Sequence, residues 1–323
     1  MDADDIDMFE RGLRDVTGRT TGAALDAELD ELGWDDALDD DEQSAVSLLF
    51  GLQGRAGATS SALSRLMTHA LGLPGSSAED VMTVLPAIGV TTPPGTLDGD
   101  RLRVDGLSPA GLADQASALV VASVGHGATT ACRVATADLE LRPVVGVDPD
   151  LGLLRVIGDV DGTGRRVDLP TGAWDAGIAL GCLATGHELV GASRAMLDLA
   201  CDHARERIQF DRPIASFQAV RHRLAEALVA VAMAEAMLDA AWLDPGPVSA
   251  AMAKSVAGHQ ARTASRHCQQ VLAGIGFTVE HPFHRYVRRT LVLDSLFGTS
   301  ASLATRLGNS IIDEGRLPPL LPL

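Results

Sequence analysis

Positive charge is scarce in this sequence, and lysine is almost absent. Lys254 is the only lysine among 26 basic residues, and these face 43 aspartates and glutamates, which gives a formal net charge of -17. A surface this acidic repels the phosphates of nucleic acids and of anionic lipids, so we expect neither as a partner. Small anionic ligands remain compatible, because a local arginine cluster can outweigh a distant field that salt screens over about 10 Å.

Aromatic residues, cysteines and long uncharged stretches are also rare. Aromatics make up 3% of the chain, so Ala, Leu and Val must fill the interior. The four cysteines are far apart and form no CxxC or Cys/His spacing, which indicates a reduced cytoplasmic chain without a metal centre. The most apolar segment, residues 225–243, contains Glu226, Glu235 and Asp239, which would be costly in a bilayer. The acidic N-terminus has no apolar core, so we expect no secretory signal.

The pattern of the 323 residues changes twice along the chain. Apolar residues have helical spacing up to about residue 85, and short Val-, Thr- and Leu-rich runs separated by Gly, Asp and Pro follow. Helical spacing then returns and persists. We therefore predict a mostly α, α+β fold with an N-terminal helical domain (1–85), a small β-barrel or sheet domain (86–170) and a C-terminal four-helix bundle (171–323).

Local signals divide the predicted bundle into helices. Pro213 ends the first helix, because proline lacks an N–H and clashes with the preceding turn. The helix after it is expected to turn Leu228 toward the core. A third helix starts at Pro247, with Gly274 as its C-terminal cap. A fourth starts close to Thr299, which is a good N-cap residue.

Two motifs in this last third resemble the acyl-CoA dehydrogenase family. Residues 203–227, HARERIQFDRPIASFQAVRHRLAEA, resemble that family's YAxxRxQFGxPIxxFQxxxHxLA stretch. Residues 268–300, CQQVLAGIGFTVEHPFHRYVRRTLVLDSLFGTS, resemble its QxxGGxGY motif and its EGT-type ending. The order of helical, β and helical regions agrees with that family too, so the resemblance implies an acyl-CoA dehydrogenase-like fold.

The resemblance also implies a flavin cofactor, FAD. In that family the C-terminal bundle of one subunit lines the adenine and diphosphate of an FAD that is seated mainly on a neighbouring subunit. The cofactor-binding residues implied here are Arg207, Gln209, Phe210 and Gln218 on one side and Gln270, Gly274, Gly276 and Thr299 on the other. An arginine suits a diphosphate because its planar donors make charge-assisted hydrogen bonds. Taken singly, each residue also has an ordinary structural explanation, such as a surface charge or a helix end.

The carboxylate that acyl-CoA dehydrogenation requires is missing from both of its expected positions. By resemblance the base is the residue before the Gly-Thr of the EGT-type ending, here Phe297, or the residue 26 positions before the motif arginine, here Gly181. Glu188 lies two helical turns beyond Gly181, about 10 Å further along at 1.5 Å per residue. Asp294 and Glu280 are near the motifs, and we expect both to be solvated surface residues. The prediction is that this chain has no catalytic residue.

The segments that hold the flavin ring in that family are absent between residues 85 and 170. We therefore expect a subunit of a heteromeric acyl-CoA dehydrogenase, inactive alone, that completes the FAD site of a full-length, base-bearing partner chain. That partner would bind most of the acyl-CoA substrate, and the family precedent includes α2β2 enzymes of steroid side-chain β-oxidation. Two alternatives stay open, namely a flavin-dependent hydroxylase of the same fold and a non-enzymatic helical scaffold subunit.

Overall fold

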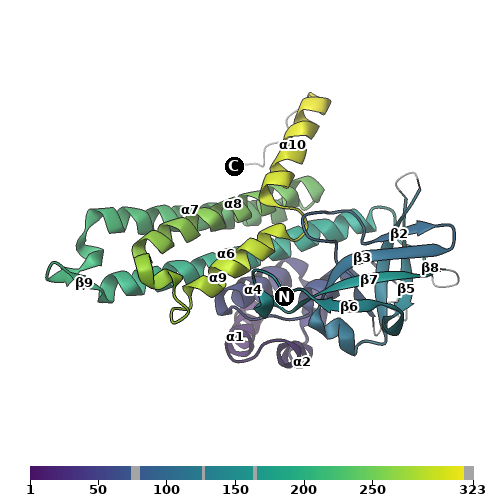
Figure 1. The fold of residues 1–323 in the computed structure, drawn as a ribbon, viewed down its shortest axis with the longest axis horizontal. Helices are drawn as coiled ribbons and strands as arrows, with labels where there is room; N and C mark the ends of the chain where they lie inside the picture. Colours follow the sequence, from purple (N-terminus) through teal and green to yellow (C-terminus); the bar gives the residue numbers. More distant parts are fainter. Residues whose placement is uncertain (74–80, 126–127, 163–165, 316–323) are drawn as a thin grey trace.

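A computed structural model describes residues 1–73, 81–125, 128–162 and 166–315 (Figure 1). Short helices form its N-terminal part, and their ends follow local capping chemistry. Asp2 and Asp5 form a capping box at the start of the first helix, and Asp41 accepts a hydrogen bond from the Ser44 N–H at 3.1 Å. The helices are α1 (Ala3–Arg19), α2 (Ala23–Glu31), α3 (Trp34–Asp40), α4 (Glu42–Ala56) and α5 (Ala62–Ala70).

A mixed sheet follows, in the strand order β6-β7-β3-β2-β4-β5-β8, with β1 paired to β4. The β1–β4 and β2–β4 pairs are parallel and the other pairs are antiparallel. One face encloses its own small core, which includes Val104, Val120 and Val134. The strands are β1 (Val81–Thr83), β2 (Gly95–Asp98), β3 (Arg101–Pro109), β4 (Ser117–Val124), β5 (Ala128–Ala135), β6 (Glu140–Pro143), β7 (Leu153–Asp161) and β8 (Arg166–Val167).

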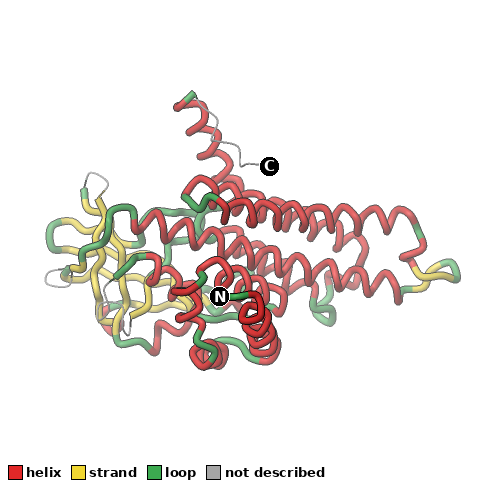
Figure 2. The backbone as a smooth tube through the Cα atoms, turned by 180° about the vertical axis from the view of Figure 1, so that it is seen from behind, coloured by secondary structure: helices red, strands yellow, loops and turns green. Residues whose placement is uncertain are grey.

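The C-terminal part is a long helical bundle that extends away from the sheet (Figures 1 and 2). Its helices are α6 (Ala173–Glu206), α7 (Gln218–Leu243), α8 (Pro247–Leu272), α9 (Phe283–Ser295) and α10 (Ser300–Glu314). The helix α9, which was not predicted from the sequence, packs against α6 and α8. The four bundle helices are therefore α6 to α9. The helix that begins after Thr299 is α10, which packs on α8 and projects from the body (Figure 1).

The inner face predicted for α7 was wrong at Leu228. The Leu228 side chain is 49% exposed, and Val229 and Met233 are exposed as well. Ala227 and Ala230 are buried. An alanine-rich helix has no strong apolar stripe, so spacing alone does not define its buried side. The alanines let α8 approach closely, and the larger side chains point outward.

Glycines bring the N-terminal helices into direct backbone contact with the bundle. A Cβ at Gly191 of α6 would lie 2.0 Å from the Gly51 carbonyl oxygen of α4, and a Cβ at Gly54 would lie 2.2 Å from the Glu188 carbonyl oxygen. No side chain fits at either position, because Cβ contacts below 3.0 Å essentially do not occur. This close crossing fixes α4 on α6 and thereby orients the buried side chain of Glu188.

Candidate functional site

A short hairpin closes the far end of the bundle and carries the first motif. Its strands are β9 (Ile208–Gln209) and β10 (Arg212–Pro213), between α6 and α7, at the end of the bundle opposite the sheet (Figures 1 and 2). The Arg207 N–H bonds to the His203 carbonyl at 2.9 Å, and the Arg207 carbonyl accepts the Ile214 N–H at 2.8 Å. Both the N–H and the carbonyl of Arg207 are thus hydrogen-bonded. Its exposed side chain makes no hydrogen bond or ion pair within the described residues.

The tip of the hairpin presents an aromatic side chain to solvent. Phe210 is 85% exposed and lies edge-on to Phe217, with 6.0 Å between the ring centroids. The Arg212 guanidinium stacks over the Phe217 ring, 4.3 Å from its centroid. A large apolar ring this exposed is better explained by a ligand or a partner than by the packing of its own chain.

Non-glycine residues with positive φ stand at two positions where the family motifs have glycine. Asp211, in the QFGxPI position, has φ 61°, and Ala273, in the first glycine position of QxxGGxGY, has φ 52°. The left-handed region costs an L-residue roughly 1–2 kcal/mol. Ala273, not Gly274, therefore ends α8, so the predicted glycine cap was wrong. Both turns keep the shape that a glycine would give them.

The implied cofactor-binding residues fall into two groups. Gln209, Phe210, Gln218 and Arg207 lie on the hairpin and the first turn of α7, with Gln270 and Gly274 at the adjoining end of α8. The start of α7 lies next to the end of α8, because an Nη atom of Arg223 on α7 is 3.4 Å from Nδ1 of His267 on α8. Gly276 is buried beside them, and a Cβ there would lie 2.5 Å from Gln269 Nε2.

Thr299 lies apart from that group. It is the N-cap of α10 and accepts a hydrogen bond from the Ser302 N–H at 3.0 Å. The next residue, Ser300, accepts a bond from the Ser255 hydroxyl at 2.8 Å. Ser255 and Gln270 are both on α8, 15 residues and therefore about 22 Å apart. One chain thus presents the implied cofactor-binding residues on two separate surfaces.

The hairpin end is basic although the whole chain is acidic. Arginines and histidines gather where α6 ends, α7 starts, α8 ends and α9 starts. Such a concentration creates a local positive potential suited to phosphate groups. The residues are Arg205, Arg207, Arg212, Arg221, Arg223, Arg266 and Arg285, with His203, His222, His267, His281 and His284.

The two positions where the family carries its base meet in space, and neither has a carboxylate. A Cβ at Gly181 would lie 2.6 Å from the ring of Phe297, which is 2% exposed and has φ 54°. The Cys182 thiol packs 3.7 Å from the Phe297 carbonyl oxygen, and burial raises the pKa of that thiol to about 11. A phenyl ring therefore fills the space beside Gly181, where no side chain could accompany it.

Glu188 is committed to a buried ionic cluster. Its carboxylate lies 3.4 Å from Arg289 Nη1, and Arg289 Nε donates to Asp148 at 2.6 Å. The same Nη1 donates to the Ala58 carbonyl at 2.8 Å. The side chains of all three charged residues are at most 5% exposed. The adjoining cavity of about 20 Å³, lined mainly by leucines, holds no more than about one water.

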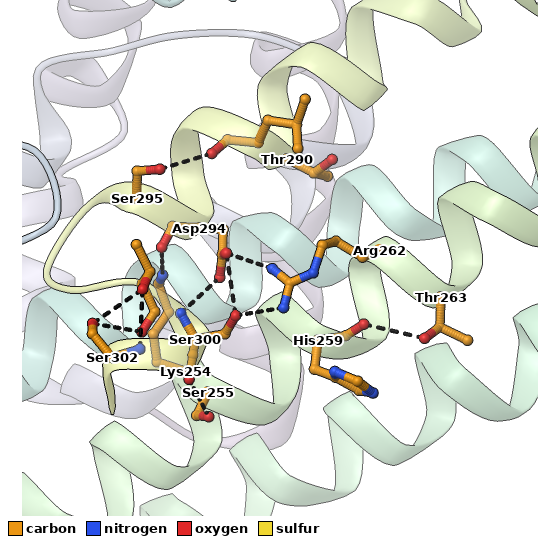
Figure 3. A network of polar contacts seen from close by, with 12 residues as sticks. Lys254, Ser255, His259, Arg262, Thr263, Thr290, Asp294, Ser295, Ser300 and Ser302 are labelled. Carbon is orange, nitrogen blue, oxygen red and sulfur yellow. Dashed lines mark hydrogen bonds and ion pairs between the residues drawn. The ribbon is translucent and has the colours of Figure 1, made fainter. Parts of the chain in front are cut away.

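Asp294 is also a structural residue, and its predicted surface role was wrong (Figure 3). Its carboxylate bonds to Arg262 at 2.5 Å and accepts the Ser300 N–H at 3.1 Å. Its carbonyl accepts a bond from the ammonium group of Lys254 at 3.1 Å, and that lysine is fully buried. This network sets the start of α10. Glu280 is exposed, as the sequence analysis expected.

The described residues contain no His/Cys/Asp/Glu group that could hold a metal ion. No described helix has the length and hydropathy needed to cross a membrane. The candidate chemistry therefore lies at the hairpin end and at the Phe297 position.

Comparison with known proteins identifies the C-terminal part. Residues 176–312 match the family "Acyl-CoA dehydrogenase, C-terminal domain". Acyl-CoA dehydrogenase IpdE2 of Mycobacterium tuberculosis is 35% identical over 138 residues, 42% of this chain and 43% of that protein. Acyl-CoA dehydrogenase FadE34 of the same organism is 36% identical over 151 residues, 41% of this chain and 21% of that protein. These matches span less than half the length of either relative.

Solved structures extend the likeness of fold to the whole chain. The Tcur3481-Tcur3483 steroid ACAD aligns with a TM-score of 0.79 and 20% identity over 97% of this chain and 99% of that one. The ChsE4-ChsE5 complex from Mycobacterium tuberculosis gives 0.74 and 22%, over 99% of both chains. Butyryl-CoA dehydrogenase from Megasphaera elsdenii gives 0.76 and 18%, over 97% and 100%. The predicted acyl-CoA dehydrogenase-like fold is confirmed.

Proposed function

We propose that this chain is a subunit of a heteromeric, FAD-dependent acyl-CoA dehydrogenase. It completes the FAD site of a base-bearing partner chain and does not itself remove the substrate proton. The observation that carries the proposal is the phenyl ring of Phe297 packed against Gly181. Acyl-CoA dehydrogenation needs a carboxylate there to take the proton α to the thioester, and neither residue can accept a proton. The residual cavity beside Glu188 leaves no room for an acyl chain.

The hairpin end has groups that suit the nucleotide half of FAD. Arg207 offers an unpaired guanidinium fork for a diphosphate, and Phe210 offers an exposed ring face for an adenine. The bound flavin would supply hydride acceptance. The residues of this chain would position its diphosphate and adenine and screen them from water, while the partner supplies the base and most of the acyl-CoA site.

The class of partner and substrate follows from the relatives. A structural neighbour is a steroid ACAD, and another is a complex of two named chains. We therefore assign a full-length acyl-CoA dehydrogenase chain as partner and a steroid side-chain CoA ester as the substrate to test first. The exposed α7 face with Leu228, Val229 and Met233 provides an apolar surface for assembly.

Purification of the chain with and without a full-length acyl-CoA dehydrogenase chain of the same organism tests the proposal. We expect flavin absorbance and acyl-CoA desaturation only in the co-purified complex. A yellow preparation of the chain alone would instead favour the hydroxylase alternative. A complex in which FAD content is unaffected by this chain would favour the scaffold alternative.

Arg207→Ala sharpens this test, with Arg205→Ala as its matched control. Arg205 lies two residues earlier on the same helix end and pairs with Asp202 at 2.8 Å. Removing one member of a desolvated charge pair at an interface typically costs about 2–5 kcal/mol. We therefore expect the Arg207→Ala complex to lose FAD on gel filtration and the Arg205→Ala complex to retain it. Equal flavin retention by the two variants would show that Arg207 is an ordinary surface residue.

A further inference from the structure

The half-buried His203 lies near Arg207 at the hairpin end, and a second half-buried histidine, His281, lies near His203. His203 lies one helical turn before Arg207, so both side chains lie on the same face of α6. His281 lies two residues before the start of α9, and its Nδ1 accepts the Phe283 N–H at 3.2 Å. The proton of a neutral His281 ring is therefore on Nε2, which makes no hydrogen bond within the described part of the chain. His281 thus has a donor to spare.

The charged surroundings of both rings are mostly basic. His203 faces His281, Arg207 and Glu206, and His281 faces His284. His284 Nδ1 lies 2.7 Å from the His281 carbonyl oxygen. His284 and Arg288 are four residues apart in α9, so they share one basic face of that helix. Within it the buried Nε of Arg288 has no partner among the described residues.

The pKa of both imidazoles is lowered in the free chain. Burial lowers the pKa of His203, and the neighbouring charges of His281 and Arg207 lower it further. Burial, followed by the His284 charge, lowers the pKa of His281. A diphosphate bound by Arg207 would reverse the balance, because a nearby anion favours the imidazolium form.

We infer that His203 and His281 are further diphosphate-binding residues, which take up protons when the nucleotide binds and make its retention pH-dependent. This inference rests on the proposed function, because Arg207 supplies the first contact with the diphosphate. Protons taken up on binding mean tighter binding at lower pH. If the pKa of one histidine rises by one unit on binding, the affinity gained between mildly alkaline and mildly acidic pH is about tenfold.

The first measurement uses the full chain and ADP as the probe. Histidine side-chain NMR signals are titrated between pH 5.5 and pH 8.5 with and without ADP. We expect ADP to raise the pKa of His203 and His281 and to bind more tightly at the acidic end, by about tenfold for each histidine whose pKa rises by one unit. The exposed His259 on α8 is the internal reference, and its signal is expected to be unaffected.

The second measurement uses the complex and follows FAD release by flavin fluorescence over the same pH range. The double variant with His203→Gln and His281→Gln is expected to release FAD equally at all pH values, while His259→Gln keeps the wild-type dependence. An unchanged pH dependence in the double variant, with FAD still lost on Arg207→Ala, would overturn the histidine inference and leave the proposed function standing. No effect of Arg207→Ala would overturn both.

Discussion

The most demanding test of the fold is the removal of the positive charge at the junction of its three parts. Arg289 of α9 joins Asp148, which precedes the turn before β7, to Glu188 of α6 and to the Ala58 carbonyl at the end of α4. Arg289→Met keeps much of the side-chain volume and removes the charge and every donor. Two carboxylates then remain buried without a counter-ion.

The expected loss follows from that burial. Removing one partner of a buried ion pair typically destabilises a protein by about 3–5 kcal/mol, because the other charge stays desolvated. Arg101→Met is the matched control, since Arg101 also bonds an aspartate, Asp159, at 2.6 Å, with its side chain 71% exposed. Exposed pairs contribute little, because water and salt screen them.

Urea denaturation, followed by far-UV circular dichroism, measures both variants at the same pH. We expect a large shift of the midpoint for Arg289→Met and almost none for Arg101→Met. Adding Glu188→Gln to Arg289→Met should recover part of the loss, because it removes one of the unpaired charges. Equal midpoints for the two single variants, or no recovery in the double variant, would refute the argument from burial.

Two further predictions concern the buried residues Glu188 and Phe297. Burial raises the pKa of Glu188 more than the Arg289 charge lowers it, so the folded state binds its proton more tightly than the unfolded state does. The free energy of unfolding should therefore fall as pH rises above the ordinary glutamate pKa of about 4.3, and Glu188→Gln should flatten that slope in urea titrations between pH 5 and 8. Phe297→Glu should leave the chain without acyl-CoA dehydrogenase activity and lower its stability, because the new carboxylate is buried against Gly181; turnover by this variant would contradict the proposed division of roles.

Local sequence signals predicted where a helix begins better than they predicted which helices lie side by side. Thr299 marks a real boundary, because a capping hydroxyl acts within one turn of the chain, whereas the end predicted at Pro213 was wrong because α6 already ends at Glu206. The outward side chain of Leu228 and the buried position of Asp294 depend on which helices lie alongside, which spacing does not encode.

The same limit applied to the candidate site. The sequence showed that Gly181 and Phe297 both lack a carboxylate, but their direct contact spans 116 positions and needed the fold. From the sequence, Glu188 was rejected as the catalytic base only because of its distance along the helix. The structure gives a stronger reason, because its carboxylate pairs with Arg289. Glu188 is the only acidic residue of α6 between Asp175 and Asp198, in a stretch rich in glycine and alanine, and this was the signal for a buried partner of opposite charge.

The two ends of the bundle have been shaped by different constraints. At the base position the reactive group is replaced by a phenyl ring that packs against glycine, which serves only the stability of this chain. At the hairpin end Asp211 and Ala273 keep left-handed turns although each costs the folded chain energy, and Phe210 gains little burial in return. A strained turn that presents an exposed ring is unfavourable for an isolated chain. It becomes favourable once a nucleotide and a second chain cover that ring, so the energetics of the hairpin support a role in assembly rather than in independent catalysis.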